Sequence, residues 1–298
     1  MKISEILKKN NVSISFEIFP PKKDSAFDSV MNTALSLANL KPDFMSITCG
    51  AGGTTQKNTE EIAIQLQQKG NVTSIAHLTC IGATKEHIQS VTNVLKQNNI
   101  KNIFALRGDF PPGTDASSLS KDFSHASDLV KLLKSSDDFC VGGACYPEGH
   151  PESKNRDEDL DLLRYKVDAG CDFLTTQMFF DNDMLYNFLY RMQSKGIHVP
   201  VLAGIMPITH KSQISKMISL SNAYMPRKLL TIIDKYADSP EALMQAGIAY
   251  ATDQIIDLIT NNIPGIHIYT MNKPDVASSI MKNISSIVDS VNNRTINA

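Results

Sequence analysis

The residues best suited to chemistry in this sequence are polar side chains that each follow a short apolar run. The clearest case is the pair Arg107 and Asp109, a cation and an anion separated only by Gly108, directly after residues 102–106. Residues 111–113, Pro-Pro-Gly, then prevent any continuation of a strand or helix. In an α/β enzyme, a polar pair on a stiff loop at the carboxyl end of a strand is typical of an active site. Taken by itself, this loop is equally compatible with a surface turn that holds a weak ion pair.

A polar residue at the end of an apolar run occurs several times along the chain, and this recurrence favours the active-site interpretation. Polar residues stand at or just past the ends of successive apolar runs, namely Glu17, Thr48, His77, Arg107 with Asp109, Tyr146 and Gln177. In a closed parallel barrel the carboxyl ends of the strands surround one mouth. Side chains that are distant in the sequence are therefore expected to share one pocket.

Glu17 is the candidate for proton transfer. It lies on the polar side of the alternating stretch 12–19, is flanked by Phe16 and Phe19, and is expected to face the barrel interior. Apolar surroundings and a second acidic residue across the mouth both disfavour the carboxylate, which suits a general acid. The alternative is a carboxylate paired with Arg107, and the sequence does not decide between the two.

Other polar positions have two interpretations each. The glycine-rich loop from Cys49 to Thr55 favours a tight turn between strand and helix over an anion site made of backbone N–H groups. His77 is suited either to donating to a phosphate or to packing in the core. The dinucleotide pattern Gly-x-Gly-x-x-Gly and the acyl-transfer pattern Gly-x-Ser-x-Gly are absent. No clustered ligand spacing occurs, so no metal site is predicted.

Hydrophobic periodicity predicts the elements that position these side chains. The predicted strands are residues 12–19, 44–48, 73–78, 102–106, 139–145, 173–177, 200–205 and 267–269, and the predicted helices are residues 25–40, 58–69, 84–98, 127–135, 159–169, 183–195, 212–221 and 274–290. A short N-terminal helix and added helices before the last strand complete the pattern. Alternating strands and helices imply right-handed βαβ units. Eight units in 298 residues favour an α/β fold of the (β/α)8 TIM-barrel type over an open sheet, and we expect residues 1–298 to form one catalytic domain.

The composition limits the classes of binding partner and the cellular compartment that we expect for this protein. A formal net charge of −2, with no basic block, argues against nucleic acid and anionic membranes. We find no signal peptide and no segment able to span a bilayer. Five cysteines without a Cys-x-x-Cys pair favour a reducing compartment, the cytoplasm, and Cys80, Cys140 and Cys171 are expected to be small buried hydrophobes.

Eight motifs together resemble methylenetetrahydrofolate reductase of the bacterial, FAD-dependent type. They are SFEIFPPK (15–22), SITCGAGG (46–53), HLTC (77–80), ALRGD (105–109), YPEGHP (146–151), KVDAG (166–170), TQMFFD (176–181) and YTMN (269–272). They follow the family's order over nearly the whole chain. The resemblance implies a homo-oligomeric flavoprotein oxidoreductase that uses FAD and NADH or NADPH. Its reaction converts 5,10-methylenetetrahydrofolate to 5-methyltetrahydrofolate in one-carbon metabolism and methionine biosynthesis.

The resemblance also implies roles for individual residues. Glu17 matches the general acid that protonates folate N10, and Asp109 matches the aspartate near both flavin and pterin. The implied substrate-binding residues are Glu17, Asp109, Gln177, Gln213, Met217 and Lys273. The implied cofactor-binding residues are Thr48, Cys49, Ala51, His77, Arg107, Gly108, Asp109, Ala144, Tyr146, His150, Asp159 and Lys166.

Five positions depart from the family pattern and leave flavin affinity and the choice of nicotinamide open. They are His125 for a tyrosine, Leu162 for a polar residue, Tyr165 for a basic residue, Met217 for an aromatic residue and Lys273 for an arginine. Two other functions also stay open: a flavin barrel that takes electrons from a protein partner, and a non-catalytic flavin- or folate-binding protein. Two acidic residues in one pocket argue against the second, because simple binding gains nothing from burying them.

Overall fold

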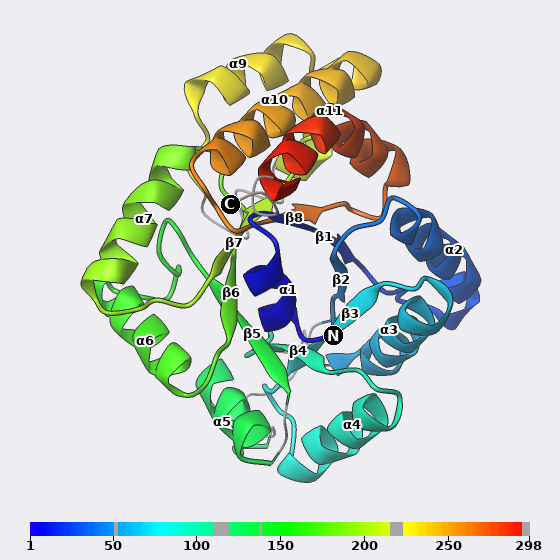
Figure 1. Ribbon diagram of the computed structural model, residues 1–298, viewed down its shortest axis with the longest axis vertical. Helices are drawn as coiled ribbons and strands as arrows, with labels where there is room; N and C mark the ends of the chain where they lie inside the picture. Colours follow the sequence, from blue (N-terminus) through cyan, green and yellow to red (C-terminus); the bar gives the residue numbers. More distant parts are fainter. Residues whose placement is uncertain (51–52, 110–119, 137–138, 215–222, 294–298) are drawn as a thin grey trace.

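The eight predicted strands close into a parallel barrel (Figure 1). The computed structural model describes residues 1–50, 53–109, 120–136, 139–214 and 223–293. The strands, which pair in sequence order, are β1 (Ser13–Ile18), β2 (Phe44–Ile47), β3 (Thr73–Thr79), β4 (Asn102–Leu106), β5 (Cys140–Cys145), β6 (Phe173–Thr176), β7 (Val201–Ile205) and β8 (Gly265–Tyr269). β8 pairs with β1 and so closes the ring, with Glu17 opposite Tyr269. The TIM-barrel prediction is confirmed.

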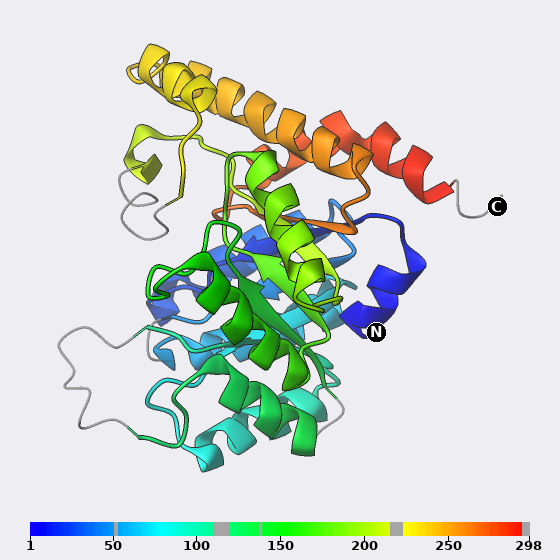
Figure 2. The same ribbon diagram turned by 90° about the vertical axis from the view of Figure 1, so that its left-hand side faces the viewer.

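Helices surround the barrel at the expected positions. They are α1 (Ile3–Lys9), α2 (Phe27–Ala38), α3 (Gln56–Lys69), α4 (Lys85–Gln97), α5 (Ala126–Ser136), α6 (Arg156–Asp168), α7 (Asn182–Ser194), α9 (Arg227–Lys235), α10 (Pro240–Thr260) and α11 (Pro274–Asn293). The added helices are α9 and α10, which lie beside α11 on one side of the molecule (Figure 2). In the described ranges, no helix has the length and apolar character needed to cross a membrane. The helix predicted at residues 212–221 falls mostly outside the described residues.

Local chemistry sets where the helices begin. Residues 24–26 form a 3-10 turn, so α2 starts two residues later than predicted. Thr84 accepts a hydrogen bond from the His87 N–H and caps α4. Asn155 accepts from the first backbone N–H groups of α6, which therefore begins at Arg156 and not at the predicted Asp159.

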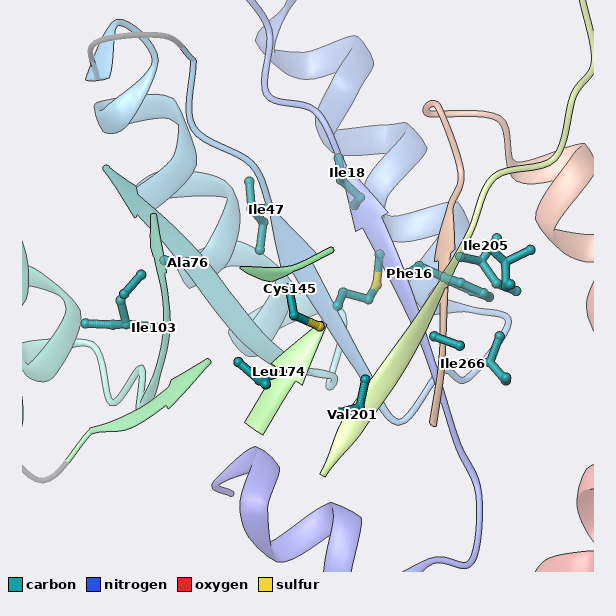
Figure 3. Packing of buried hydrophobic residues seen from close by; sticks show 14 of the residues in the cluster. Phe16, Ile18, Ile47, Ala76, Ile103, Cys145, Leu174, Val201, Ile205 and Ile266 are labelled. Atoms are coloured by element: carbon teal, nitrogen blue, oxygen red, sulfur yellow. The ribbon is translucent and has the colours of Figure 1, made fainter. Parts of the chain in front are cut away.

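The side chains of each strand alternate between two layers of core. On β1, Phe16 and Ile18 belong to the layer between barrel and helices, and Figure 3 shows them with Ile47 and Ile266 of the neighbouring strands. The other face of β1 carries Ser13, Ser15 and Glu17, all buried. This period-two alternation directs Glu17 into the barrel, as predicted.

The amino end of the barrel is closed by α1, which crosses it in Figure 1. Ile3 and Ile6 pack in one buried cluster with Phe44, Phe104 and other inward side chains of the strands. Asn102, the first residue of β4, fixes the helix because its Oδ1 accepts from the Ile3 N–H at 2.8 Å. With this end closed, the carboxyl ends of the strands are left as the open mouth.

Candidate active site

A cavity of about 740 Å³ opens at the carboxyl ends of the strands. Its lining includes most of the residues singled out in the sequence: Glu17, Thr48, Cys49, His77, Arg107, Gly108, Asp109, Ala144, Tyr146, His150 and Gln177. The polar groups predicted at the strand ends therefore meet in one place, and Glu17 and Asp109 open onto the same mouth.

Aromatic side chains form the floor of this cavity. Phe44, Phe104 and Phe173 point inward from β2, β4 and β6 and separate the cavity from α1. The Phe104 and Phe173 ring centroids lie 6.4 Å apart. An apolar floor below a few convergent polar groups is typical of a small-molecule site.

Glu17 is 7% exposed and has histidine neighbours. Its Oε2 lies 3.8 Å from His77 Nε2 and 3.7 Å from His267 Nε2. The expected source of its burial was wrong, because Phe16 faces the opposite layer and Phe19 is 37% exposed. Depth inside the barrel shields this carboxyl group instead.

His77 is buried beside Glu17 and packs on Phe104, with ring centroids 4.8 Å apart. Burial lowers the pKa of His77 to about 4, although the nearby Glu17 opposes this shift. The imidazole is therefore neutral near pH 7. It lines the cavity and packs against its floor, which agrees with the core-packing interpretation, and donation to a phosphate stays a prediction.

In the turn after β4, Arg107 pairs with neither Asp109 nor Glu17, the two partners that the sequence suggested. Arg107 donates two hydrogen bonds to Glu152, at 2.6 and 2.8 Å, and this pairing raises the pKa of Arg107 and lowers that of Glu152. Gly108 has φ +83°, and a Cβ there would lie 2.8 Å from Thr79 Cβ, so the turn requires glycine. Asp109 is exposed at the rim. The alternative pairing of Arg107 with Glu17 is wrong.

The glycine-rich loop is a tight turn in its described part. Thr55 Oγ1 accepts from the Gly50 N–H at 2.8 Å, and the Gly50 carbonyl accepts from the Gly53 N–H at 3.0 Å. These two N–H groups are used within the loop. Cys49 is half-buried, and burial raises the pKa of its thiol. Ala51 lies outside the described residues.

A second cavity, of about 380 Å³, adjoins the first between α5 and α6. Both cavities are lined by Arg107, Ala144, Tyr146 and His150, and the second adds Asp159 and Lys166 together with the departing positions His125, Leu162 and Tyr165. Lys166 donates to the Ala144 carbonyl at 2.6 Å, and burial lowers its pKa. Burial also raises the pKa of Tyr146 to about 12, which keeps its hydroxyl protonated near pH 7.

Gln213 and Lys273, two of the predicted substrate-binding residues, are linked through Thr209 after β7. Gln213 Oε1 accepts from the Thr209 and His210 N–H groups, each at 2.8 Å, and Lys273 Nζ donates to Thr209 Oγ1 at 3.0 Å. Neither side chain is part of the lining of the larger cavity. Met217 lies outside the described residues. Within those residues, no group of three His, Cys, Asp or Glu side chains is arranged to hold a metal.

Comparison with known proteins decides the family. The methylenetetrahydrofolate reductase family model matches residues 2–285. The 5,10-methylenetetrahydrofolate reductase of Escherichia coli is 34% identical over 272 residues, which are 91% of this chain and 90% of the bacterial one. The chain belongs to the methylenetetrahydrofolate reductase family. An Arabidopsis thaliana relative, methylenetetrahydrofolate reductase (NADH) 1, is 33% identical over 99% of this chain, which spans 52% of the plant protein.

A solved structure supports the fold of this family member. An uncharacterised Clostridium thermocellum protein that binds two copies of 5-methyl-5,6,7,8-tetrahydrofolic acid superposes with a TM-score of 0.62. The match covers 97% of this chain and 99% of the other, at 18% identity, so it shows a shared fold alone.

Several lining residues of this methylenetetrahydrofolate reductase family member were missed in the sequence. They are Phe44, Phe104, Glu152, Phe173, Thr176, His267 and Tyr269. The alternation of β8, in which His267 and Tyr269 alternate with isoleucines, was a usable signal for two of them. No local pattern marks Glu152, because its role depends on a contact with Arg107.

Proposed function

We propose that this protein reduces 5,10-methylenetetrahydrofolate to 5-methyltetrahydrofolate, with FAD as its bound cofactor and NADH as the reductant. The observation that carries the proposal is the position of Glu17, a buried carboxyl group at the mouth of the barrel of a methylenetetrahydrofolate reductase. The NADH-dependent name of the Arabidopsis relative supports this choice of nicotinamide.

The shape and donors of the two cavities fit FAD. The spaces of about 740 and 380 Å³ adjoin each other and share lining residues, among them Arg107, Ala144, Tyr146 and His150. The larger has an aromatic floor suited to a flat ring system. Arg107, which lines both cavities, and Lys166, which lines the smaller one, are suitable partners for phosphate oxygens. When bound, FAD supplies the hydride-transfer chemistry, and the protein supplies position and electrostatics.

We assign proton donation and folate binding to individual residues of the chain. Glu17 donates a proton to folate N10, which opens the five-membered ring of the substrate. Asp109, on the exposed rim, and Gln177, in the cavity wall, hold the pterin. Gln213, Met217 and Lys273 are assigned to the outer parts of the folate.

Replacing Glu17 by glutamine tests this function. In Glu17→Gln loaded with FAD, NADH should still bleach the flavin, because that step needs no proton from Glu17. Reduction of methylenetetrahydrofolate should fall about 10²–10⁴-fold, the usual contribution of a general acid. A near wild-type rate of folate reduction would show that Glu17 has another role.

Glu60→Gln is a matched control, because Glu60 is a partly buried glutamate on α3 outside both cavities. It should keep both steps. If the wild-type protein binds FAD but NADH does not bleach the bound flavin, the flavin receives its electrons from a protein partner. Wild-type protein that binds folate and FAD without turnover would indicate a binding protein.

A further inference from the structure

The turn that follows β8 is joined to the end of β1 by side chains. The backbone register of these two strands ends where Glu17 stands opposite Tyr269. Two positions further along β1, Phe19 is followed by Pro20 and Pro21, which have no N–H to donate. Glu17 and Phe19 both line the larger cavity. The position of this part of the cavity wall therefore depends on the contacts that replace the backbone pairing.

The side chain of Asn272 supplies two of these contacts. Its Oδ1 accepts a hydrogen bond from the Phe19 N–H at 2.9 Å, and its Nδ2 donates to the Phe19 carbonyl at 2.8 Å. A carboxamide carries the same kinds of donor and acceptor as a peptide group, so Asn272 continues the edge of β8 with a side chain. On the opposite edge, the Thr48 N–H donates to the Ile18 carbonyl at 2.9 Å. Both edges of the end of β1 are thus held.

Thr270 makes the contact nearest to Glu17. This threonine is 1% exposed, and its Oγ1 donates to the Glu17 carbonyl oxygen at 2.7 Å. The same oxygen atom accepts from the Asn272 N–H at 3.2 Å. One hydroxyl group therefore connects the backbone of the proposed proton donor to the residue that holds Phe19.

The turn adopts a backbone conformation that is unfavourable for its sequence. The Lys273 N–H donates to the Thr270 carbonyl at 3.0 Å, and the two central residues, Met271 and Asn272, have φ angles of +52° and +56°. Positive φ at both central positions is typical of a type I′ turn, which glycine, asparagine and aspartate dominate. Asparagine tolerates this region, whereas methionine is disfavoured there. Such strain persists where the surrounding contacts determine the conformation, and it is typical of functional sites.

The same turn also sets the position of Lys273, which we assign to the outer parts of the folate. Lys273 Nζ donates to Thr209 Oγ1 at 3.0 Å, in the segment after β7. One short turn therefore contacts the end of β1 and the segment after β7. Asn272 itself lines neither cavity, so any effect of its side chain on the reaction must act through the residues that it holds.

We propose that Asn272 is a positioning residue for the reaction: its carboxamide, together with the hydroxyl of Thr270, fixes the end of β1 and so keeps Glu17 and Phe19 in place in the cavity wall. The purpose of this arrangement rests on the proposed reductase function. The hold on β1 is measurable without any turnover.

Hydrogen exchange of the Phe19 amide, measured by NMR on the full-length protein loaded with FAD, tests the hold on β1. Asn272→Gly removes both bonds to Phe19, and glycine adopts positive φ readily, so the turn itself is retained. The Phe19 amide should exchange about tenfold faster than in the wild type, as expected when one hydrogen bond is lost.

Asn262→Gly is the matched control. Asn262 has a φ angle of +60°, precedes β8 at its amino end and is exposed. Among the described residues, no partner is hydrogen-bonded to its side chain. The change of residue and the backbone conformation are thus the same as in Asn272→Gly, but no contact with β1 is lost. Exchange of the Phe19 amide should stay at the wild-type rate.

Kinetics separates positioning from a merely structural role. The kcat of folate reduction by Asn272→Gly should fall about tenfold to hundredfold, because a small displacement of Glu17 from folate N10 slows proton transfer. NADH should still reduce the flavin at the wild-type rate, whereas a general loss of structure would slow both steps. Thr270→Val keeps the shape of the side chain but removes the hydroxyl, and it should slow folate reduction in the same selective way. Thr270→Ser restores the hydroxyl and should recover most of the rate.

Three results would overturn the positioning role. They are an unchanged exchange rate of the Phe19 amide in Asn272→Gly, faster exchange with folate reduction at the wild-type rate, and an equal slowing of both kinetic steps. If Asn272→Gly fails to fold, the pair of Thr270 variants decides the question, and equal rates of folate reduction in Thr270→Val and Thr270→Ser would count against the proposal.

The two proposals fail in different ways. Exchange that depends on Asn272, in a wild-type protein unable to reduce folate, would refute the reductase function and leave the hold on β1 established. Folate reduction by the wild type and by Asn272→Gly at the same rate would refute the positioning role and leave the function intact.

Discussion

Replacing Gly142 by alanine tests whether Phe104 and Phe173 are packed as part of the cavity floor. Gly142 faces inward from β5, between Phe104 of β4 and Phe173 of β6. A Cβ at this position would lie 2.4 Å from Phe173 Cζ and 2.7 Å from Phe104 Cδ2. Because the φ angle of Gly142 is not in the left-handed region, alanine adds no backbone strain, and the destabilising effect of the substitution is steric.

The expected loss follows from two opposing effects. Overpacking of a filled core costs about 1–3 kcal/mol. Alanine also restricts the unfolded chain, which stabilises the protein by about 0.4–1 kcal/mol. The net free energy of unfolding should therefore fall by about 1–2 kcal/mol, which corresponds to a Tm lower by roughly 2–3 °C for a chain of this size.

Thermal unfolding of four variants provides the assay: Gly142→Ala, Gly143→Ala, Phe173→Leu and the double variant of Gly142→Ala with Phe173→Leu. Gly143→Ala is the control, since its Cβ would point to the other layer and meet Cys171 Sγ at 3.1 Å and Lys166 Cδ at 3.2 Å, both longer than the contacts at Gly142. Gly143→Ala should lower the free energy of unfolding by less than Gly142→Ala does. Adding Phe173→Leu to Gly142→Ala should recover part of the loss, because the smaller side chain makes room for the new methyl group. An unchanged or higher Tm for Gly142→Ala, or strictly additive losses in the double variant, would refute this view of the floor.

Two further predictions concern stability. His77 should make the protein less stable in acid: its unfolded pKa is near 6.5 and its folded pKa about 4, so the unfolded state binds the proton first as the pH falls. The free energy of unfolding should drop by about 3 kcal/mol between these two pH values, and His77→Gln should flatten this slope in urea titrations. An identical slope in the variant would contradict the assignment. Asn102→Ala should remove the bond to the Ile3 N–H and those from Nδ2 to the Met1 and Ser74 carbonyls, and should lower stability by about 2–3 kcal/mol. Limited proteolysis should then cleave near α1 first; cleavage at the wild-type rate would show that the packing of Ile3 and Ile6 suffices.

The sequence by itself determined the architecture and the face of β1 that carries Glu17. Alternation of apolar and polar residues is a local property, so it directs Ser15 and Glu17 inward without reference to any other strand. The succession of strands and helices then requires the polar strand ends to surround one mouth. Helix starts were predicted less well where a cap such as Asn155 competes with the hydrophobic pattern.

Only the tertiary structure decided which polar groups face one another. Arg107 is paired with Glu152, and Glu17 lies beside His267, 250 positions away, because the closure of β8 onto β1 sets this register. Gln213 and Lys273 are likewise brought together through Thr209. A hydrogen bond depends on separations of a few tenths of an ångström between segments that approach each other only after folding. Such separations leave no periodic trace in the sequence.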